Sequence, residues 1–204
     1  MISLEGINLS AGYGGVDIIK NINLQVKQGE IAVIVGPNGA GKSTAMKALL
    51  GMLKLSDGSV KFKQDDITSM LPQDRVNLGI AFVPQTQNVF TGMSVEENLE
   101  MGGFIRDDDI SLTIEDIYNL FPILKEKRNQ NAGELSGGQR QQVAFGRALM
   151  TKPKILMLDE PTAGVSPIVM DELFSRIIEV GKTGVGILMV EQNAKQALNI
   201  ADRG

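Results

Sequence analysis

The sequence of 204 residues contains no cysteine and no histidine. Without cysteine the chain has no disulfide bonds and no thiolate nucleophile, and without histidine it has no imidazole base and no histidine metal ligand. Any chemistry must therefore use carboxylates, amides, hydroxyls and the cations of lysine and arginine.

Long apolar runs and long basic runs are also absent. No apolar segment approaches the roughly 20 residues that a membrane helix needs, and the first ten residues alternate instead of forming a signal-peptide core. The formal net charge is −4, so charge does not indicate a nucleic-acid partner. We expect a cytoplasmic chain of one domain with subdomains, whose membrane role, if it has one, comes through partner proteins.

The most informative stretch is Gly36–Thr44, which reads GPNGAGKST and matches the phosphate-binding loop pattern G-x-x-x-x-G-K-[ST]. It follows Ile31–Val35, an apolar run typical of a buried parallel strand, and precedes apolar residues at helical spacing. Such glycines let successive backbone N–H groups face one anion at a helix N-terminus. The alternative is a glycine-rich turn that binds nothing. The residues expected to bind nucleotide are Gly36, Pro37, Asn38, Gly39, Ala40, Gly41, Lys42, Ser43 and Thr44.

Within this loop, two side chains have specific expected roles. Lys42 supplies a positive charge to the β- and γ-phosphates, and the hydroxyl of Ser43 is placed to bind Mg²⁺.

Two acidic residues, Asp159 and Glu160, follow another apolar run, Ile155–Leu158. Carboxylates at the end of a buried strand are costly unless they meet a cation or water, so they indicate a site at this end of the sheet. We expect Asp159 to hold Mg²⁺ through water, and Glu160 to orient or deprotonate the water that attacks the γ-phosphate. The alternative is an acidic helix start, which the helix dipole stabilises.

The remaining pattern predicts an α/β fold with three kinds of segment. Alternating strands form an antiparallel β subdomain, strands and helices form a nucleotide-binding core, and a stretch of helices with almost no strands forms an inserted helical subdomain. The expected bounds are 1–30 and 56–70 for the β subdomain, 31–55, 71–86 and 151–204 for the core, and 87–150 for the helical subdomain.

Several local patterns predict details. The apolar alternation changes phase at Glu5-Gly6, which predicts a β-bulge. Ser56-Asp57-Gly58 predicts a turn into a short antiparallel strand, Ser59–Lys63. The S-x-x-E pattern at Ser94–Glu97 predicts a capping box that begins a helix. The ending Asp202-Arg203-Gly204 has no terminal strand, and we expect the natural sequence to continue.

Leu135–Gln139 reads LSGGQ, and with this motif the sequence resembles the ATP-binding subunits of ABC transporters. The other motifs of the resemblance are GPNGAGKST, VPQ at Val83–Gln85, ILMLDEPT from Ile155 and VEQN from Val190, and together they cover nearly the whole chain. The resemblance implies a P-loop (RecA-like) ABC ATPase core with an N-terminal antiparallel β subdomain and an inserted α-helical subdomain. It also implies ATP and Mg²⁺ as cofactors, with ATP binding that closes a dimer and hydrolysis that reopens it.

The resemblance assigns roles to individual residues. Tyr13, which by its chemistry alone could stack on adenine or cover the sheet, becomes the adenine-stacking aromatic. Gln85 contacts Mg²⁺ and the attacking water. The implied catalytic residues are Glu160, Gln85 and Gln192, and the implied metal ligands are Ser43, Gln85 and Asp159.

The LSGGQ segment is expected to act on another subunit. A serine followed by glycines before a helix expected over Arg140–Met150 offers a hydroxyl, free N–H groups and a helix dipole to an anion. The alternative is an ordinary helix-entry turn. By resemblance this segment caps the γ-phosphate of ATP on a head-to-tail partner, through Leu135, Ser136, Gly137, Gly138 and Gln139.

Two positions depart from the family pattern. Ser166 stands where the family usually has an aspartate, and Gln192 where it usually has the histidine that contacts the γ-phosphate. A glutamine amide can donate a hydrogen bond but is neutral and does not titrate. We therefore expect this ATP site to be slow or to need help from outside.

EPTAGVSP together with VEQN is similar to one of the two ATPase subunits of branched-chain amino acid importers. That similarity implies a second, unlike ABC ATPase, two membrane permease subunits and, indirectly, a periplasmic or extracellular substrate-binding protein. The chain would then be peripheral, at the cytoplasmic face of the cell membrane. Transport ATPases for urea, short-chain amides and lipopolysaccharide share much of the pattern.

Two other classes of protein fit the sequence less well than a transporter subunit. A soluble ABC-type ATPase of DNA repair or translation usually carries a coiled-coil insert or tandem ATPase halves, and neither is visible in this sequence. A small-molecule kinase would leave LSGGQ and Glu160 unexplained.

Overall fold

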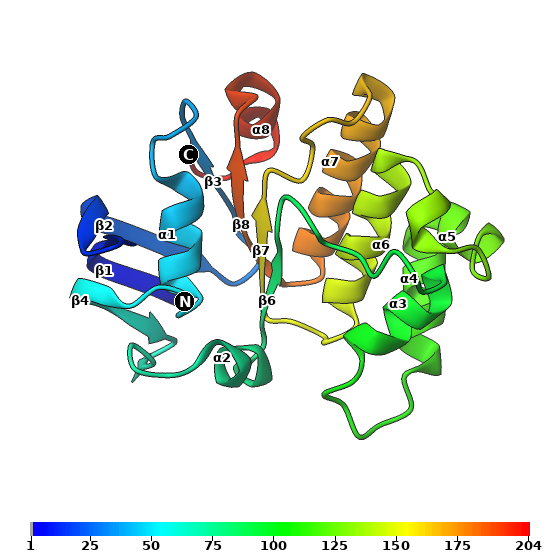
Figure 1. Cartoon of the computed structure of the whole chain (residues 1–204), viewed down its shortest axis with the longest axis horizontal. Helices are drawn as coiled ribbons and strands as arrows, with labels where there is room; N and C mark the ends of the chain where they lie inside the picture. Colours follow the sequence, from blue (N-terminus) through cyan, green and yellow to red (C-terminus); the bar gives the residue numbers. More distant parts are fainter. Residues whose placement is uncertain (1) are drawn as a thin grey trace.

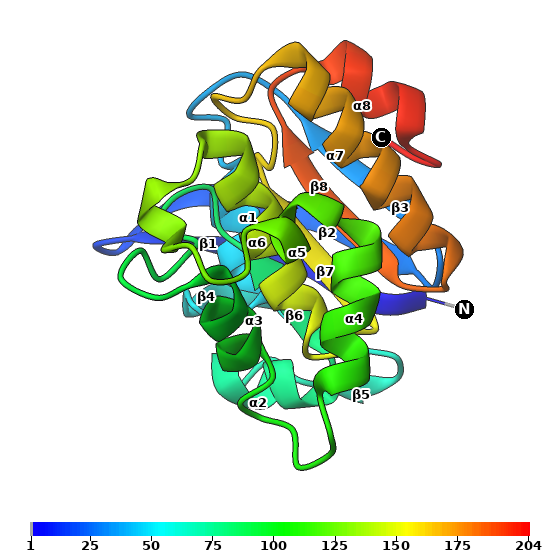
Figure 2. The ribbon, with the colours of Figure 1, turned by 90° about the vertical axis from the view of Figure 1, so that its right-hand side faces the viewer.

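The computed structural model describes residues 2–204 of the chain (Figures 1 and 2). The strands are β1 (Ile2–Tyr13), β2 (Val16–Lys27), β3 (Ile31–Val35), β4 (Leu55–Phe62), β5 (Asp65–Asp66), β6 (Ile80–Val83), β7 (Ile155–Asp159) and β8 (Gly186–Glu191). In this part of the chain they form two four-stranded sheets, with the strand orders β2-β1-β4-β5 and β3-β8-β7-β6. The first sheet is antiparallel and the second is parallel.

The helices connect and cover these sheets. They are α1 (Lys42–Leu49), α2 (Pro72–Leu78), α3 (Val95–Gly102), α4 (Ser111–Leu120), α5 (Pro122–Glu126), α6 (Gly137–Leu149), α7 (Pro167–Lys182) and α8 (Ala194–Ile200), with a short 3₁₀ helix, η1 (Ala132–Glu134). Within residues 2–204, no helix combines the length and the apolar character needed to cross a membrane.

The parallel sheet is covered on both faces, which explains why β7 and β8 are almost continuously apolar. Figure 1 shows α1 between the two sheets, and α6 and α7 on the opposite face of the parallel sheet. Accordingly, the buried residues form two clusters, one between the sheets around α1 and one between the parallel sheet and the helices of the other side.

The segment 87–150 consists of helices and loops, and the isolated bridge between Ser94 and Asn131 is the β structure found among its residues. Its helices α3 to α6 form a group at one side of the molecule, which faces the viewer in Figure 2. Phe121 and Phe145 pack edge to face at 5.6 Å inside this group, so the segment has apolar packing of its own. The fold is therefore a mixed α/β fold, in which a parallel sheet is combined with an N-terminal antiparallel sheet and a helical segment, as the resemblance implied.

Two local predictions in the antiparallel sheet are wrong in detail. The pairing of β1 with β2 shifts register between Ile2 and Leu4 and at several places between Gly6 and Gly12, where Asn8 has φ +51°, and not at Glu5-Gly6. Ser56-Asp57-Gly58 is not a turn but part of β4, which pairs with β1. The reason is tertiary: at φ +93° Gly58 lies beside the irregular part of β1, where a Cβ atom would be 2.5 Å from the Asn8 carbonyl oxygen.

Candidate functional site

The phosphate-loop segment Gly36–Thr44 connects the carboxyl end of β3 to the first turn of α1. Gly41 is the N-cap residue of α1 at φ +84°, and a Cβ atom there would lie 2.7 Å from the side chain of Ile19. Only glycine fits this position, because the conformation is left-handed and the neighbour is close. In the described part of the chain no side chain caps α1, so its first N–H groups remain available to an anion. Pro37, Asn38, Gly39 and Ala40 are exposed, and Thr44 is buried.

Lys42 lies inside the loop rather than in solvent. Its Nζ donates hydrogen bonds to the backbone oxygens of Gly36 at 2.8 Å and Pro37 at 3.0 Å. It is also 3.8 Å from Glu160 Oε1, and both side chains are buried. The ammonium group is thus held at the centre of the loop, between the expected phosphate site and the expected catalytic carboxylate.

Asp159, the last residue of β7, reaches the same helix start. The hydroxyl of Ser43 donates a hydrogen bond to Asp159 Oδ1 at 2.9 Å. Burial raises the pKa of the Asp159 carboxyl, and the hydrogen bond from Ser43 opposes that shift. Two of the three expected ligands of Mg²⁺, Ser43 and Asp159, therefore lie side by side, and both offer oxygen atoms, which is the ligand type this ion prefers.

Two amides converge on one oxygen of Glu160. Gln85 Nε2 donates to Glu160 Oε2 at 2.7 Å, and Gln192 Nε2 donates to the same atom at 2.5 Å. Gln85 follows β6 and Gln192 follows β8, so the three residues leave neighbouring strands at their carboxyl ends. The structure therefore brings together the three residues that the resemblance implied to be catalytic.

The backbone of Glu160 is unusual as well. Its φ of +49° is a left-handed conformation that a residue with a long side chain rarely adopts. Backbone hydrogen bonds hold it in place, from Glu160 N to Val190 O at 2.9 Å and from Ala163 N to Glu160 O at 3.0 Å. Such conformations persist only where the surroundings determine them, and they concentrate at functional sites.

The segment Leu135–Gln139 lies apart from this cluster. Across residues 2–204, no hydrogen bond or ion pair joins it to Gly36–Thr44 or to Glu160. Ser136 caps α6 in a reciprocal capping box with Gln139, so the helix begins at Gly137 rather than at the expected Arg140. The segment thus presents an exposed helix N-terminus outside the chain's own phosphate loop.

Gly138 fixes where this helix start packs. A Cβ atom at Gly138 would lie 2.5 Å from Val169 in α7, so a larger residue would push α6 away from it. The start of α6 therefore packs closely against the start of α7.

Tyr13 ends β1 and is 47% exposed. Lys47 of α1 lies beside it, with Nζ 3.4 Å from the tyrosine hydroxyl and 5.8 Å from the ring centroid. Much of the ring is accessible to solvent near the helix that starts in the phosphate loop.

One residue of the site was not predicted as a site residue. Glu191, at the end of β8, is only 2% exposed, and burial raises its pKa, although hydrogen bonds from Thr162 and Gln192 oppose that shift. The signal was present in the sequence, because Glu191 ends an apolar strand just as Asp159 does.

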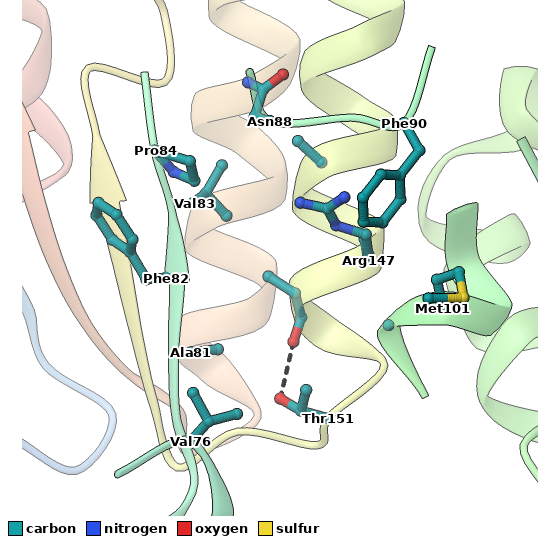
Figure 3. Close-up of a pocket in the computed structure, with 13 residues that line it drawn as sticks. Val76, Ala81, Phe82, Val83, Pro84, Asn88, Phe90, Met101, Arg147 and Thr151 are labelled. Atoms are coloured by element: carbon teal, nitrogen blue, oxygen red, sulfur yellow. Dashed lines mark hydrogen bonds between the residues drawn. The ribbon is translucent and has the colours of Figure 1, made fainter. Parts of the chain in front are cut away.

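A pocket of about 300 Å³ lies between β6 and the helical segment (Figure 3). Val83 and Pro84 line one side, and Phe90, Met101 and Arg147 line the other. The guanidinium of Arg147 stacks on the Phe90 ring at 4.7 Å, and burial lowers its pKa. Within the described residues, no carboxylate forms an ion pair with Arg147. The pocket therefore combines apolar walls with one unpaired cation.

Comparisons with known proteins agree with this geometry. The family profile described as ABC transporter matches residues 19–163. The chain is 42% identical over 204 residues to the high-affinity branched-chain amino acid transport ATP-binding protein BraG of Pseudomonas aeruginosa, covering 100% of this chain and 87% of BraG. It is 40% identical over 201 residues to the probable branched-chain amino acid transport ATP-binding protein LivF of Archaeoglobus fulgidus, covering 98% and 85%. The lipopolysaccharide export system ATP-binding protein LptB of Escherichia coli is 35% identical over 207 residues, covering 100% and 86%.

Solved structures give the same result. A nucleotide-free ATP-binding cassette from an ABC transporter has a TM-score of 0.87 at 32% identity, covering 99% of this chain and 86% of the other. The ADP conformation of the cassette MJ1267 has a TM-score of 0.86 at 32% identity, covering 99% and 85%. The phosphate loop, the clustered carboxylates and these similarities over nearly the whole chain lead to one conclusion: this chain belongs to the ABC transporter family and is an ATP-binding cassette ATPase.

Proposed function

We propose that this chain is the ATP-hydrolysing subunit of an ABC importer that takes up branched-chain, hydrophobic amino acids. Two of its relatives, BraG and LivF, are named for branched-chain amino acid transport, and their identities exceed that of LptB. Lipopolysaccharide, urea and short-chain amides are the alternative solutes. The proposal includes the division of the chain that the sequence predicts, into a β subdomain, a nucleotide-binding core and a helical subdomain.

The observation that carries the catalytic part is the convergence of two amides on Glu160. Glu160 takes a proton from, or orients, the water that attacks the γ-phosphate. Gln85 and Gln192 hold the carboxylate oriented until nucleotide binds, because both donate to its Oε2 atom. Once ATP is bound, the amide of Gln192 would donate to the γ-phosphate, and Gln85 would contact Mg²⁺ and the attacking water.

Nucleotide binding uses the other expected residues. The N–H groups of Gly36–Thr44 and the ammonium of Lys42 bind the phosphates, and Tyr13 stacks on the adenine. Ser43, Asp159 and Gln85 hold Mg²⁺, an ion that proteins usually bind through one or two carboxylates together with substrate phosphates. When bound, the cation neutralises negative charge on the phosphates.

A second, unlike ABC ATPase completes the site. The exposed Ser136 and Gly137 at the start of α6 contact ATP held by that partner, in a head-to-tail dimer. Their separation from the chain's own phosphate loop supports this role, because the anion they would bind must come from another chain.

The transporter has two membrane permease subunits, and one of them docks in the pocket beside Phe90 and Arg147. Its apolar walls suit an apolar helix of the permease, and the unpaired Arg147 suits a carboxylate on that helix. The pocket adjoins the loop that carries Gln85, so docking can be sensed at the catalytic carboxylate. The chain would sit at the cytoplasmic face of the cell membrane, and a substrate-binding protein would contact it only indirectly.

The test is transport by the complex reconstituted in liposomes. The chain with its co-purifying subunits should take up leucine, isoleucine or valine only with ATP inside, and should not transport urea, acetamide or lipopolysaccharide. Glu160→Gln keeps the side-chain shape but removes the base, so hydrolysis and uptake should fall about a hundred-fold or more while ATP binding survives. Normal turnover in this variant, or transport of one of the alternative solutes instead, would contradict the corresponding part of the proposal.

A pull-down of the membrane subunits from the same complex tests whether the pocket is the docking site. Arg147→Glu should bind ATP normally but lose the membrane subunits in a pull-down, because a carboxylate in the pocket repels the partner's carboxylate. Arg128→Glu makes the same charge change on an exposed part of the helical subdomain and serves as the control. Retention of the membrane subunits by Arg147→Glu would place the docking site elsewhere.

A further inference from the structure

Glu191 is a buried carboxylate surrounded by hydrogen-bond donors. Its Oε1 accepts hydrogen bonds from the backbone N–H of Thr162 at 3.1 Å and the Thr162 hydroxyl at 2.7 Å. Its Oε2 accepts from the backbone N–H of Gln192 at 3.2 Å. Burying a carboxylate is costly, so a charge kept at this position calls for a reason.

These contacts link the two segments that meet at Glu160. Thr162 lies two residues after Glu160 along the chain, and Gln192 directly follows Glu191. Because Gln192 Nε2 also donates to Glu160 Oε2 at 2.5 Å, the contacts form a closed ring. The ring runs from Glu160 through Thr162, Glu191 and Gln192 back to Glu160.

The backbone conformation of Glu160 makes such a ring useful. Its φ of +49° is disfavoured and must be maintained by neighbouring groups. Glu191 fixes the backbone and the side chain of Thr162, two residues away, while Val190 accepts the N–H of Glu160 at 2.9 Å. Together these bonds define the direction in which the Glu160 side chain leaves the backbone.

Only a carboxylate satisfies both sides of the ring. Thr162 and Gln192 each present a backbone N–H, and an ionised glutamate has an acceptor oxygen for each of them. A glutamine at this position would place its NH₂ group against one of the two donors and lose that contact. The chemistry of the position therefore distinguishes glutamate from its closest neutral analogue.

We propose that Glu191 is a positioning residue for ATP hydrolysis: it holds Glu160 and Gln192 in a fixed relation by bonding Thr162 on one side and the Gln192 backbone on the other. The inference rests on the roles proposed above for Glu160 and Gln192. It adds a residue that touches neither the nucleotide site of Lys42 nor Glu160 itself, since the link runs through Thr162 and Gln192.

The test compares steady-state ATP hydrolysis by the full chain in complex with its co-purifying subunits. Glu191→Gln and Thr162→Val should each lower kcat about tenfold, with KM changed less than about twofold. Thr162→Ser, which keeps the hydroxyl, should retain the wild-type kcat. The double variant should be no slower than Glu191→Gln alone, because both changes break the same link.

Glu30→Gln is the matched control. Glu30 also accepts a backbone N–H, from Lys27 at 2.6 Å, and an arginine N–H, from Arg203 at 2.9 Å, but it lies at the amino end of β3, away from the site. Its removal should leave kcat unchanged. Rates are expressed per ATP-binding site, so that loss of folded protein does not count as loss of kcat.

An unchanged kcat in Glu191→Gln, or independent and multiplying effects of Glu191→Gln and Thr162→Val, would overturn the inference. Glu160→Gln, measured in parallel, separates this failure from failure of the proposed function. If Glu160→Gln is inactive while Glu191→Gln is normal, Glu160 keeps its proposed role and Glu191 loses its own.

Discussion

At the scale of single residues, the site is defined by carboxylates kept out of water. Asp159, Glu160 and Glu191 are all buried at the carboxyl edge of the parallel sheet. Each has a donor: Ser43 bonds Asp159, two glutamine amides bond Glu160, and Thr162 bonds Glu191. Lys42 is the cation nearest to Glu160. A hydrogen-bond donor or a cation therefore offsets part of the cost of burying each carboxylate.

The pH dependence of stability provides a test of burial at Glu191. Because burial raises its pKa above the ordinary 4.5, the folded state binds more protons than the unfolded state between 4.5 and the raised value. The contribution of Glu191 to the free energy of unfolding is therefore greatest below pH 4.5 and declines as pH rises through the folded-state pKa. Urea unfolding between pH 4 and pH 8 should show wild type losing stability relative to Glu191→Gln over this window.

The pKa of Glu30 is shifted in the opposite direction from that of Glu191. Burial would raise its pKa, but the hydrogen bonds from Arg203 and the Lys27 N–H outweigh it, so the pKa is lowered below 4.5. Glu30 therefore stabilises the fold above pH 4.5, and that contribution is lost as pH falls through the folded-state pKa.

A stability difference between wild type and Glu191→Gln that does not change with pH would contradict the prediction for Glu191. It would show that Glu191 has the same pKa in the folded and unfolded states.

The site residues were predictable where a short motif encodes them locally. Lys42 and Ser43 follow from the spacing of the phosphate loop, and Asp159 from its place after an apolar strand. The bonds from Thr162 to Glu191 were not predictable, because they require knowing that β7 and β8 are neighbours in the order β3-β8-β7-β6. Arg75 is another such residue: it is buried and donates to the carbonyl oxygens of Leu49, Thr68 and Met70, contacts that no sequence pattern announces.

At the scale of elements, buried strands and capped helices follow local sequence best. Helix α2 (Pro72–Leu78) and strand β6 (Ile80–Val83) are examples, because a proline start and a compact apolar run define them locally. Strands whose bounds depend on a partner far away in the sequence are harder to predict. The start of β4 at Leu55 depends on pairing with β1, which overrides the turn propensity of Asp57-Gly58.

Helices α3 and α6 begin with the same kind of capping motif, so the effect of removing the cap can be compared between them. Ser94 with Glu97 in α3 and Ser136 with Gln139 in α6 both form reciprocal capping boxes. Ser94→Ala and Ser136→Ala should each lower the free energy of unfolding by about 1 kcal/mol. Only Ser136→Ala should also lower ATP turnover of the assembled complex, about tenfold or more, because Ser136 is proposed to contact the partner's ATP. Urea unfolding and ATPase assays separate the two effects, and equal turnover in both variants would reduce Ser136 to a capping residue.

At the scale of the whole molecule, the fold brings residues far apart in sequence to one edge. The phosphate loop, Gln85, Glu160 and Gln192 follow four strands that are parallel neighbours, so their carboxyl ends coincide. The LSGGQ segment packs on α7 through Gly138 and Val169 instead. In the proposed head-to-tail dimer, one chain would therefore supply two complementary halves of a site.

The composition of those halves predicts an asymmetric dimer. Two copies of this chain would place Gln192, in place of the usual histidine, and Ser166, in place of the usual aspartate, in both ATP sites. Ser166 is exposed at the start of α7 and its side chain makes no capping hydrogen bond. The isolated chain should therefore be a weak ATPase, and pairing with an unlike ATPase that retains histidine and aspartate should restore turnover by keeping one better-equipped site.

Substitutions at Gln192 test the predicted asymmetry, both in the isolated chain and in the assembled complex. Gln192→Ala should lower turnover, because the amide that donates to Glu160 in the present structure is lost. Gln192→His should raise turnover of the isolated chain and introduce a pH dependence near neutrality, since an imidazole titrates there and an amide does not. The measurement is ATPase activity against pH, for the isolated chain and the assembled complex with each variant. A homodimer that hydrolyses ATP vigorously and is indifferent to both changes would refute the asymmetry, because its two sites would then need neither the imidazole nor the unlike partner.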